Sequence, residues 1–261
     1  MHTLKLSTDP RGVARVVLAR PEIMNAFDET MIAELAETFT TLGRSREVHI
    51  VVLEAEGRAF SAGADLRWMQ RASRNTPEEN LADARRFAAM METIHRCPKP
   101  VIARVQGHAY GGGVGLIAAS DIVIASAQCR LAVTEARFGI IPAVIGPYLI
   151  AAVGRRQAQR LALTALPIDA SEALAIGLVH RVVAPEALDA ELELIVTSLC
   201  SNGPTAFTEI KSLYAQLPEG QIDAMTSELS ARAISRVRAT DEAREGFAAF
   251  FEKRPARWVR G

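Results

Sequence analysis

The chain has 261 residues, of which 49% are hydrophobic and 23% are charged, and its 30 Lys and Arg balance 30 Asp and Glu. Such a chain can bury a large core as one large domain or two small ones. The neutral balance argues against a nucleic-acid-binding or membrane-surface protein, since those usually carry a basic excess.

The cysteines and the apolar runs point to a cytoplasmic protein. The three cysteines lie far apart, which predicts neither a disulfide framework nor a metal site and favours a reducing compartment. Residues 1–13 hold no apolar run of the kind that a signal peptide needs. The most apolar stretch, residues 138–154, is interrupted by two prolines and a glycine, so we expect no membrane span.

The first two-thirds of the chain alternates between predicted strands and helices. Residues 3–19 predict a β-hairpin with its turn at 9–12. Asp28 is placed to cap a helix over about 29–43, in which apolar residues recur at helical spacing. Short apolar runs rich in β-branched residues predict buried strands. The remaining elements are a strand at 50–57, a helix at 77–95 and strands at 99–107 and 121–127.

Helices dominate from about residue 155 onward. One more strand is predicted at 177–185, and the residues from Gly203 on look entirely helical. This pattern predicts an α/β core over residues 1–200, followed by a helical C-terminal region over residues 201–261.

Two loops rich in small residues follow buried strands and lead into helices. They are RAFSAGADLRWM at 58–69 and QGHAYGGGVGL at 106–116. Small residues let a ligand approach the backbone, and the N–H groups at the start of a helix carry partial positive charge. Two such loops side by side could direct two donors at one oxygen, which is the requirement for an oxyanion hole.

The same loops fit neither of two nucleotide-binding motifs but come close to a hydrolase motif. Neither the dinucleotide fingerprint G-x-G-x-x-G nor the P-loop ending G-K-[ST] fits residues 107–115. The sequence AFSAG at 59–63 nearly matches the nucleophile elbow G-x-S-x-G. A hydrolase with Ser61 as nucleophile and His108 or His180 as base therefore stays open at the level of motifs.

Six segments, in order along nearly the whole chain, resemble the enoyl-CoA hydratase/isomerase family, also called the crotonase family. The resemblance implies an α/β crotonase-like spiral of ββα units, with a helical C-terminal region that builds trimers or hexamers. It also implies an acyl-CoA thioester as substrate, with no cofactor or metal ion because CoA belongs to the substrate. The segments are RPEIMNAF (20–27), AFSAGADL (59–66), KPVIARVQGHAYGGGVGLIAASDIVIAS (99–126), EARFGIIPAVIGPY (135–148), EALAIGLVHRVV (172–183) and AREGFAAFFEKRPARW (243–258).

The resemblance assigns roles to single residues. The backbone N–H groups of Ala62 and Gly112 would hold the thioester oxygen as an enolate forms, and Glu135 would be the acid/base. Its apolar neighbours in sequence predict a raised pKa for Glu135. The substrate and its CoA would contact Met24, Ala26, Ala64, Asp65, Leu66, Tyr110, Gly111 and Lys253. Candidates to line the acyl pocket are Trp68, Met69, Tyr110, Val114, Phe138 and Tyr148.

Gly115 departs from the family pattern. Family hydratases typically carry one glutamate at this position and a second at that of Glu135, so this chain keeps only the second. A hydratase using Glu135 alone is the leading hypothesis, and an isomerase that shuttles a proton between Cα and Cγ is the alternative. A CoA-binding protein without catalysis is a third. Gly115 is also expected to leave room near the acyl group.

Residues 96–121 and 135–150 look like a bacterial branch assigned to methylglutaconyl-CoA or carboxygeranoyl-CoA hydration, in leucine and acyclic-terpene breakdown. Such substrates carry a distal carboxylate and favour a cation in the pocket. Candidates are His108, Arg67 and Arg137. Residues 232–261 hold eight Arg and Lys against four acids, an excess that could meet CoA phosphates across a subunit boundary.

Overall fold

The predicted hairpin forms one edge of a six-stranded sheet in this computed structural model, which describes residues 2–218, 220 and 222–259. Its two strands pair antiparallel, and every later strand of the sheet runs parallel to its neighbour. The central strands are apolar and buried on both faces, as parallel sheets require. In sheet order the strands are β1 (Leu4–Thr8), β2 (Val13–Leu18), β3 (Ile50–Ala55), β5 (Val101–Val105), β7 (Ile122–Ser126) and β10 (Arg181–Val183).

A second, four-stranded sheet lies beside the first and was not predicted from the sequence. Its strands have only two or three residues each. Three of them each follow a strand of the large sheet and precede a helical turn, so strand–strand–helix units repeat along the chain. In sheet order they are β4 (Ala59–Ser61), β6 (His108–Tyr110), β8 (Arg130–Ala132) and β9 (Ile168–Asp169).

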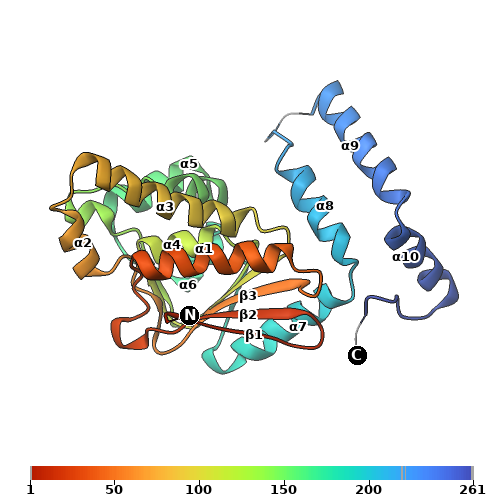
Figure 1. Ribbon diagram of the computed structural model, residues 1–261, viewed down its shortest axis with the longest axis horizontal. Coiled ribbons are helices and arrows are strands. Elements are labelled where there is room, and N and C mark those ends of the chain that lie inside the picture. The colour runs from red at the N-terminus through yellow and green to blue at the C-terminus, as the bar shows by residue number, and fades with distance from the viewer. Residues whose placement is uncertain (1, 219, 221, 260–261) are drawn as a thin grey trace.

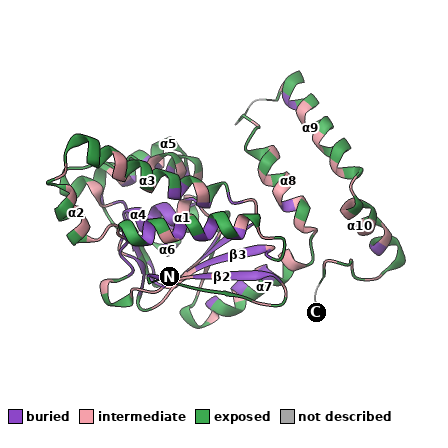
Figure 2. Ribbon diagram, viewed as in Figure 1, coloured by how far each residue is buried: buried purple, intermediate pink, exposed green. Residues whose placement is uncertain are grey.

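Helices cover both faces of the large sheet (Figure 1). α7 (Leu188–Cys200) packs on one face, where Leu188, Leu192 and Val196 are buried against the strands. The larger core lies on the other face, and Figure 2 shows the buried strands and inner helix faces. The helices there are α1 (Glu29–Arg44), α2 (Leu66–Ala72), α3 (Pro77–His95), α4 (Gly112–Ala118), α5 (Gly146–Thr164) and α6 (Ala170–Ala175). The chain also forms three 3₁₀ turns, η1 (Pro21–Ile23), η2 (Glu135–Phe138) and η3 (Pro185–Ala187), the last directly before α7.

The helix caps explain where the predicted helices begin. The carboxylate of Asp28 accepts hydrogen bonds from the backbone of Thr30 and Met31, so α1 starts where predicted. Thr76 and Glu79 form a reciprocal capping box at the start of α3. The predicted α/β architecture is confirmed, but the strand expected over 177–185 covers only the three residues of β10.

Three C-terminal helices form an arm that extends away from the sheets (Figure 1). The side chain of Thr208 donates to the backbone of Pro98, and Lys211 forms an ion pair with Asp121, so the arm is anchored at its first helix. The region is not entirely helical, because residues 215–218 and 253–259 form turns, bends and irregular segments. The division of the chain at residue 200 stays a prediction. The helices are α8 (Pro204–Tyr214), α9 (Ala224–Arg238) and α10 (Asp241–Glu252).

The apolar stretch at 138–154 forms a loop and the first half of α5 rather than a continuous helix. Gly154 has a φ of 74° and breaks the helical conformation within α5. Within the described ranges, no helix is both long and apolar enough to span a bilayer.

Candidate active site

A cavity of about 1050 Å³ lies at the ends of β4 and β6. Its walls come from residues 20–28, the loop before α2, the start of α4, η2 and residues 140–145. Ten of the eleven predicted site residues line it, namely Ala62, Gly112, Glu135, Met24, Ala26, Ala64, Asp65, Leu66, Tyr110 and Gly111. Two distant loops and η2 therefore meet in one place, as the sequence predicted.

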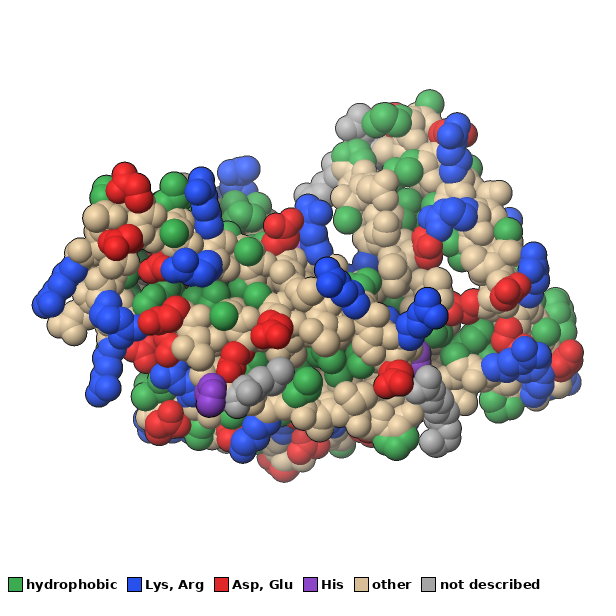
Figure 3. All heavy atoms as spheres, in the orientation of Figure 1, with side chains coloured by type: hydrophobic (Ala, Val, Ile, Leu, Met, Phe, Trp, Pro, Cys, Tyr) green, Lys and Arg blue, Asp and Glu red, His purple; other side chains and the backbone are tan. Residues whose placement is uncertain are grey.

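Lys253 is the exception among the predicted site residues. It forms the C-cap of α10 on the arm, with a φ of 53°, and the described lining of the cavity does not include it. The other basic residues of 232–254 also lie on the arm, where Figure 3 shows Lys and Arg side chains exposed at its surface. Arg260, which belongs to the same basic run, lies outside the described residues.

The loop after β4 is held by the segment that precedes α1. The side-chain amide of Asn25, fully buried, donates to the backbone oxygens of Glu56 and Ala59. The N–H of Phe27 donates to the Gly63 oxygen, and the N–H of Asp65 donates to the Phe27 oxygen. These bonds fix the backbone of the loop where it borders the cavity.

Ala64 presents a free backbone donor. In extended chain, the N–H groups of successive residues alternate in direction. Since the residues on both sides of Ala64 bond to Phe27, the Ala64 N–H points away from that partner. Across residues 2–218, 220 and 222–259, this N–H makes no backbone hydrogen bond.

The expectation for Ala62 is not met. Its N–H donates to the backbone oxygen of Met24 over 2.8 Å, so this group is already occupied within the chain. Ala62 and Ala64 are both small residues of the same loop. Only the pairing of the loop with the distant Met24 and Phe27 distinguishes their N–H groups, and the sequence carries no signal for that register.

The second donor lies at the start of α4. Gly112 is the first helical residue, so its N–H has no intrahelical acceptor. A Cβ built on Gly63 would lie 3.2 Å from the Gly112 nitrogen, which shows that the two loops touch. The free N–H groups of Ala64 and Gly112 thus belong to adjoining loops on the wall of one cavity.

The glycine run is explained by packing rather than by ligand approach. A Cβ on Gly112 would lie 2.2 Å from the ring of Phe27, and a Cβ on Gly113 would lie 2.6 Å from the Ser61 oxygen. Gly111 has a φ of 50°, a region that favours glycine. A side chain at position 112 would therefore enter the core, toward the ring of Phe27.

Glu135 places a carboxyl group against the same loop. One of its oxygens, Oε1, lies 3.2 Å from the position of a Cβ on Gly111. The other, Oε2, is buried without a hydrogen-bond partner in the part of the chain that the structure describes. Burial raises the pKa of Glu135, and the backbone N–H groups of Glu135 and Thr134 offset this only in part.

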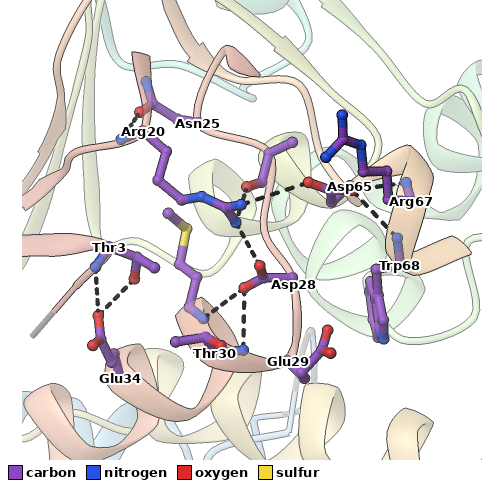
Figure 4. Close-up of polar contacts among 12 residues, drawn as sticks. Thr3, Arg20, Asn25, Asp28, Glu29, Thr30, Glu34, Asp65, Arg67 and Trp68 are labelled. Atoms are coloured by element: carbon purple, nitrogen blue, oxygen red, sulfur yellow. Dashed lines mark hydrogen bonds and ion pairs between the residues drawn. The ribbon is translucent and has the colours of Figure 1, made fainter. Parts of the chain in front are cut away.

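The other carboxylates on the cavity wall are paired. Arg20 lies 2.8 Å from a carboxylate oxygen of Asp28 and 3.6 Å from one of Asp65 (Figure 4). Asp65 also caps α2 by accepting from the backbone of Arg67 and Trp68. Asp83 pairs with Arg86. Among the described lining carboxylates, Glu135 alone has no ion-pair partner, so it is the one free to exchange a proton.

The part of the cavity beyond Glu135 is apolar. Of the residues expected to line the acyl pocket, Trp68, Met69, Tyr110 and Phe138 do so. Val114 instead lies in the core, and Tyr148 lines a separate groove, where its ring meets that of His95 at 5.3 Å. The sequence did not predict the main wall, which consists of Ile140, Ile141, Pro142, Ala143, Val144 and Ile145.

Gly115 does not leave the room that its small size suggested. A Cβ at this position would lie 2.3 Å from Cγ2 of Ile145, whose side chain already fills the space. Gly115 itself is buried in α4. The expectation of extra space near the acyl group is therefore wrong.

Ser61 is not placed as a nucleophile. It is fully buried, its hydroxyl donates to the Asn25 oxygen over 2.9 Å, and it accepts from the Gly63 N–H. The Nδ1 atoms of His108 and His180 accept from the backbone of Arg130 and Val123, respectively. Neither histidine lines the cavity as described, so the geometry argues against the hydrolase reading.

Two free N–H donors and one unpaired, buried carboxyl group beside an apolar cavity are what acid–base chemistry on a carbonyl compound requires. The site thus has the groups that an enzyme would need to stabilise an oxyanion while it moves a proton. Comparison with known proteins identifies the family. The sequence model described as Enoyl-CoA hydratase/isomerase matches residues 8–261.

Individual relatives agree with this match. The chain is 33% identical over 253 residues to a crotonyl-CoA hydratase of Syntrophomonas wolfei, which covers 95% of this chain and 94% of the relative. A crystal structure of an enoyl-CoA hydratase from Shewanella pealeana superposes with a TM-score of 0.94 at 41% identity, covering 98% of this chain and 96% of the other. An enoyl-CoA hydratase/isomerase from Marinobacter aquaeolei also gives a TM-score of 0.94, at 30% identity over the full length of both chains.

The chain belongs to the enoyl-CoA hydratase/isomerase family, and its fold is the crotonase fold. The repeated strand–strand–helix units described above are the ββα spiral that the resemblance implied.

Proposed function

We propose that this protein is an enoyl-CoA hydratase that adds water across the 2,3-double bond of a 2-enoyl-CoA thioester, with Glu135 as the single acid/base. The observation that carries the proposal is the unpaired, buried carboxyl group of Glu135 beside the free N–H groups of Ala64 and Gly112. Relatives named as hydratases of short-chain and crotonyl substrates support the reaction class.

The two N–H groups would receive the thioester oxygen. Attack at C3 moves the electron pair of the double bond onto this oxygen and gives an enolate. Preorganised donors stabilise the developing charge, and removal of one donor from such a pair costs about 3–4 kcal/mol of activation free energy. Ala64 takes the role that the resemblance assigned to Ala62, because only its N–H is free.

Glu135 would carry out both proton transfers. Its carboxylate accepts a proton from water while the water oxygen bonds to C3. The carboxyl group then donates that proton to C2, the enolate collapses and the thioester carbonyl reforms. The sum is one water added and Glu135 returned to its ionised form. The hydroxyl of Thr134, next to Glu135 on the cavity wall, is a polar group that can hold the water.

Isomerisation is the second candidate, and the wall at Gly115 favours it. Ile145 fills the position where family hydratases carry their first glutamate, so one carboxylate faces an apolar surface. A lone Glu135 could remove a proton from C2 of a 3-enoyl-CoA and return it to C4 through the same enolate. This reaction needs no bound water.

The CoA portion would lie at the mouth of the cavity. Met24, Ala26, Asp65 and Leu66 border it there, and Met24 and Leu66 are partly exposed. Lys253 would serve the cavity of a neighbouring subunit, because it lies on the arm in its own chain. The arm exposes Phe247, Phe250 and Phe251, of which the last two are 77% exposed. We propose that these phenylalanines are covered in a trimer or in a hexamer of two trimers.

A branched substrate with a distal carboxylate, of the methylglutaconyl-CoA kind, is one option within this proposal. Arg67 and Arg137 line the cavity, and Arg137 also donates to the Ala165 oxygen. His108 does not reach it. Such a substrate would place the protein in leucine or terpene breakdown, and a plain acyl chain would place it in fatty acid breakdown.

Mass analysis of products distinguishes these options. The enzyme is incubated separately with crotonyl-CoA, 3-methylglutaconyl-CoA and a 3-enoyl-CoA. The proposal predicts a gain of one water with at least one 2-enoyl substrate. Unchanged mass with a moved double bond would indicate the isomerase, and release of free CoA would contradict both candidates.

A further inference from the structure

The cavity wall near Glu135 is closed by Ile145, which stands against Gly115. Ile145 is 1% exposed and directly precedes α5, while Gly115 lies within α4. A Cβ on Gly115 would lie 2.3 Å from Cγ2 and 2.9 Å from Cβ of Ile145. The isoleucine therefore occupies the space that a side chain at position 115 would take.

Met91 of α3 borders the same space. Its methyl group lies 3.4 Å from the position of a Cβ on Gly115, and Met91 is fully buried. Ile145 also lines the cavity, which Gly115 does not do among the described residues. Ile145 thus lies between the buried Gly115 and the cavity.

The position of Gly115 in α4 places Ile145 near the expected site of the reacting carbons. Gly115 follows Gly112 by three residues, so the two lie on one face of α4, about one turn apart. The Gly112 N–H is the proposed donor to the thioester oxygen. In that orientation C2, the carbon next to the carbonyl, would lie toward the wall that Ile145 forms.

We propose that Ile145 is a specificity-determining residue of the acyl site, an inference that rests on the proposed orientation of the thioester. Its side chain limits the bulk that C2 can carry and keeps this wall free of a second carboxylate. The substrates selected are acyl-CoA thioesters that are unbranched at C2, the carbon that receives the proton.

Binding of saturated acyl-CoAs tests this directly. Butyryl-CoA and 2-ethylbutyryl-CoA differ in bulk at C2 and cannot be hydrated. They share the same CoA, so the ratio of their Kd values from calorimetry reports on the acyl site. We expect wild type to bind butyryl-CoA at least tenfold more tightly. Ile145→Ala should reduce that ratio at least fivefold, and Ile145→Val should give an intermediate value.

Leu149→Ala is the matched control. Leu149 lies in the first turn of α5, just after Ile145, and is also 1% exposed, but it is absent from the described cavity lining. Its truncation should lower stability and leave the binding ratio unchanged. An Ile145→Ala ratio equal to that of wild type, or an equal change in Leu149→Ala, would overturn the proposal. So would a wild-type ratio near one.

The contact with Gly115 is tested separately by melting temperatures. Gly115→Ala should lower the melting temperature of wild type by more than it lowers that of Ile145→Ala, because truncation of Ile145 relieves the overlap. Equal losses in both backgrounds would contradict the interlocked pair. Neither assay needs turnover, so a protein that binds as expected but converts no enoyl-CoA would contradict the proposed function and leave this inference standing.

Discussion

Substitution of Gly112 by alanine tests whether the glycine run is required for packing. The added Cβ would lie 2.2 Å from Cζ of Phe27, and 3.0 and 3.2 Å from its two Cε atoms. Carbon atoms in good contact are about 3.5–4.0 Å apart, so the ring or the helix must shift by about 1.3 Å or more. Phe27 is fully buried, and its ring centroid lies 5.3 Å from that of Phe87, so the strain spreads into the core.

The expected loss of stability follows from this overlap. Overpacking a well-packed core typically costs about 1–3 kcal/mol. For a chain of this size, each kcal/mol lowers the melting temperature by about 2–4 °C, so we expect a decrease of about 2–12 °C. Turnover should fall as well, because the shift displaces the proposed Gly112 donor. Thermal unfolding followed by circular dichroism, with kcat measured on crotonyl-CoA, gives both values.

Gly146→Ala provides the control for this experiment. A Cβ on Gly146 would meet no atom within 4 Å, and the residue begins α5, so alanine there should be neutral or slightly stabilising. A Gly112→Ala protein that melts at the same temperature as Gly146→Ala would show that the glycine at position 112 is not required for packing. Relief of the loss by Phe27→Leu in the double variant would identify the ring as the cause.

Three further predictions concern the chemistry. The acid limb of the pH profile of kcat/KM should have its midpoint above pH 4.5, the ordinary pKa of a glutamate. Burial raises the pKa of Glu135, and the reaction begins with its ionised form. A midpoint at or below pH 4.5 would argue against Glu135 as base. Ser61→Ala should lower the free energy of unfolding by about 1–3 kcal/mol, because it leaves the backbone oxygen of Asn25 and the Gly63 N–H unpaired. This variant should keep most of the activity. Complete loss of turnover in a folded Ser61→Ala protein would restore the hydrolase hypothesis. Thr134→Val should reduce the rate of crotonyl-CoA hydration by about tenfold or more, a factor that corresponds to a loss of about 1.4 kcal/mol in water binding. Isomerisation of a 3-enoyl-CoA should stay nearly unchanged. Equal losses in both assays would show that Thr134 does not hold the water.

Local patterns in the sequence were enough to predict the long elements of the fold. Asp28 and the spacing of apolar residues located α1, and the β-branched runs located β3, β5 and β7. The small sheet could not be predicted in this way, because strands of two or three residues show no periodicity. Its strands form because the chain leaves the large sheet three times in succession at the carboxyl ends of parallel strands.

The candidate site was predicted as a set of loops, but not in its atomic detail. The choice between Ala62 and Ala64 depends on pairing with Met24 and Phe27, more than thirty residues away. The packing of Gly115 depends on Ile145, thirty residues further along the chain. Such contacts follow from the assembled tertiary structure, so the sequence identified the residues without the reason for them.

The turnover of Glu135→Gln tests the central claim most directly. Glutamine keeps the shape of the side chain but can neither accept nor donate the transferred proton, and general acid–base catalysis typically contributes about 10²–10⁴-fold. The variant should also melt no lower than wild type at pH 7, since it removes a buried carboxyl group whose Oε2 has no partner among the described residues. We expect Glu135→Gln to bind butyryl-CoA as wild type does and to hydrate crotonyl-CoA at least a hundredfold more slowly. Undiminished hydration by this variant would rule out Glu135 as the acid/base.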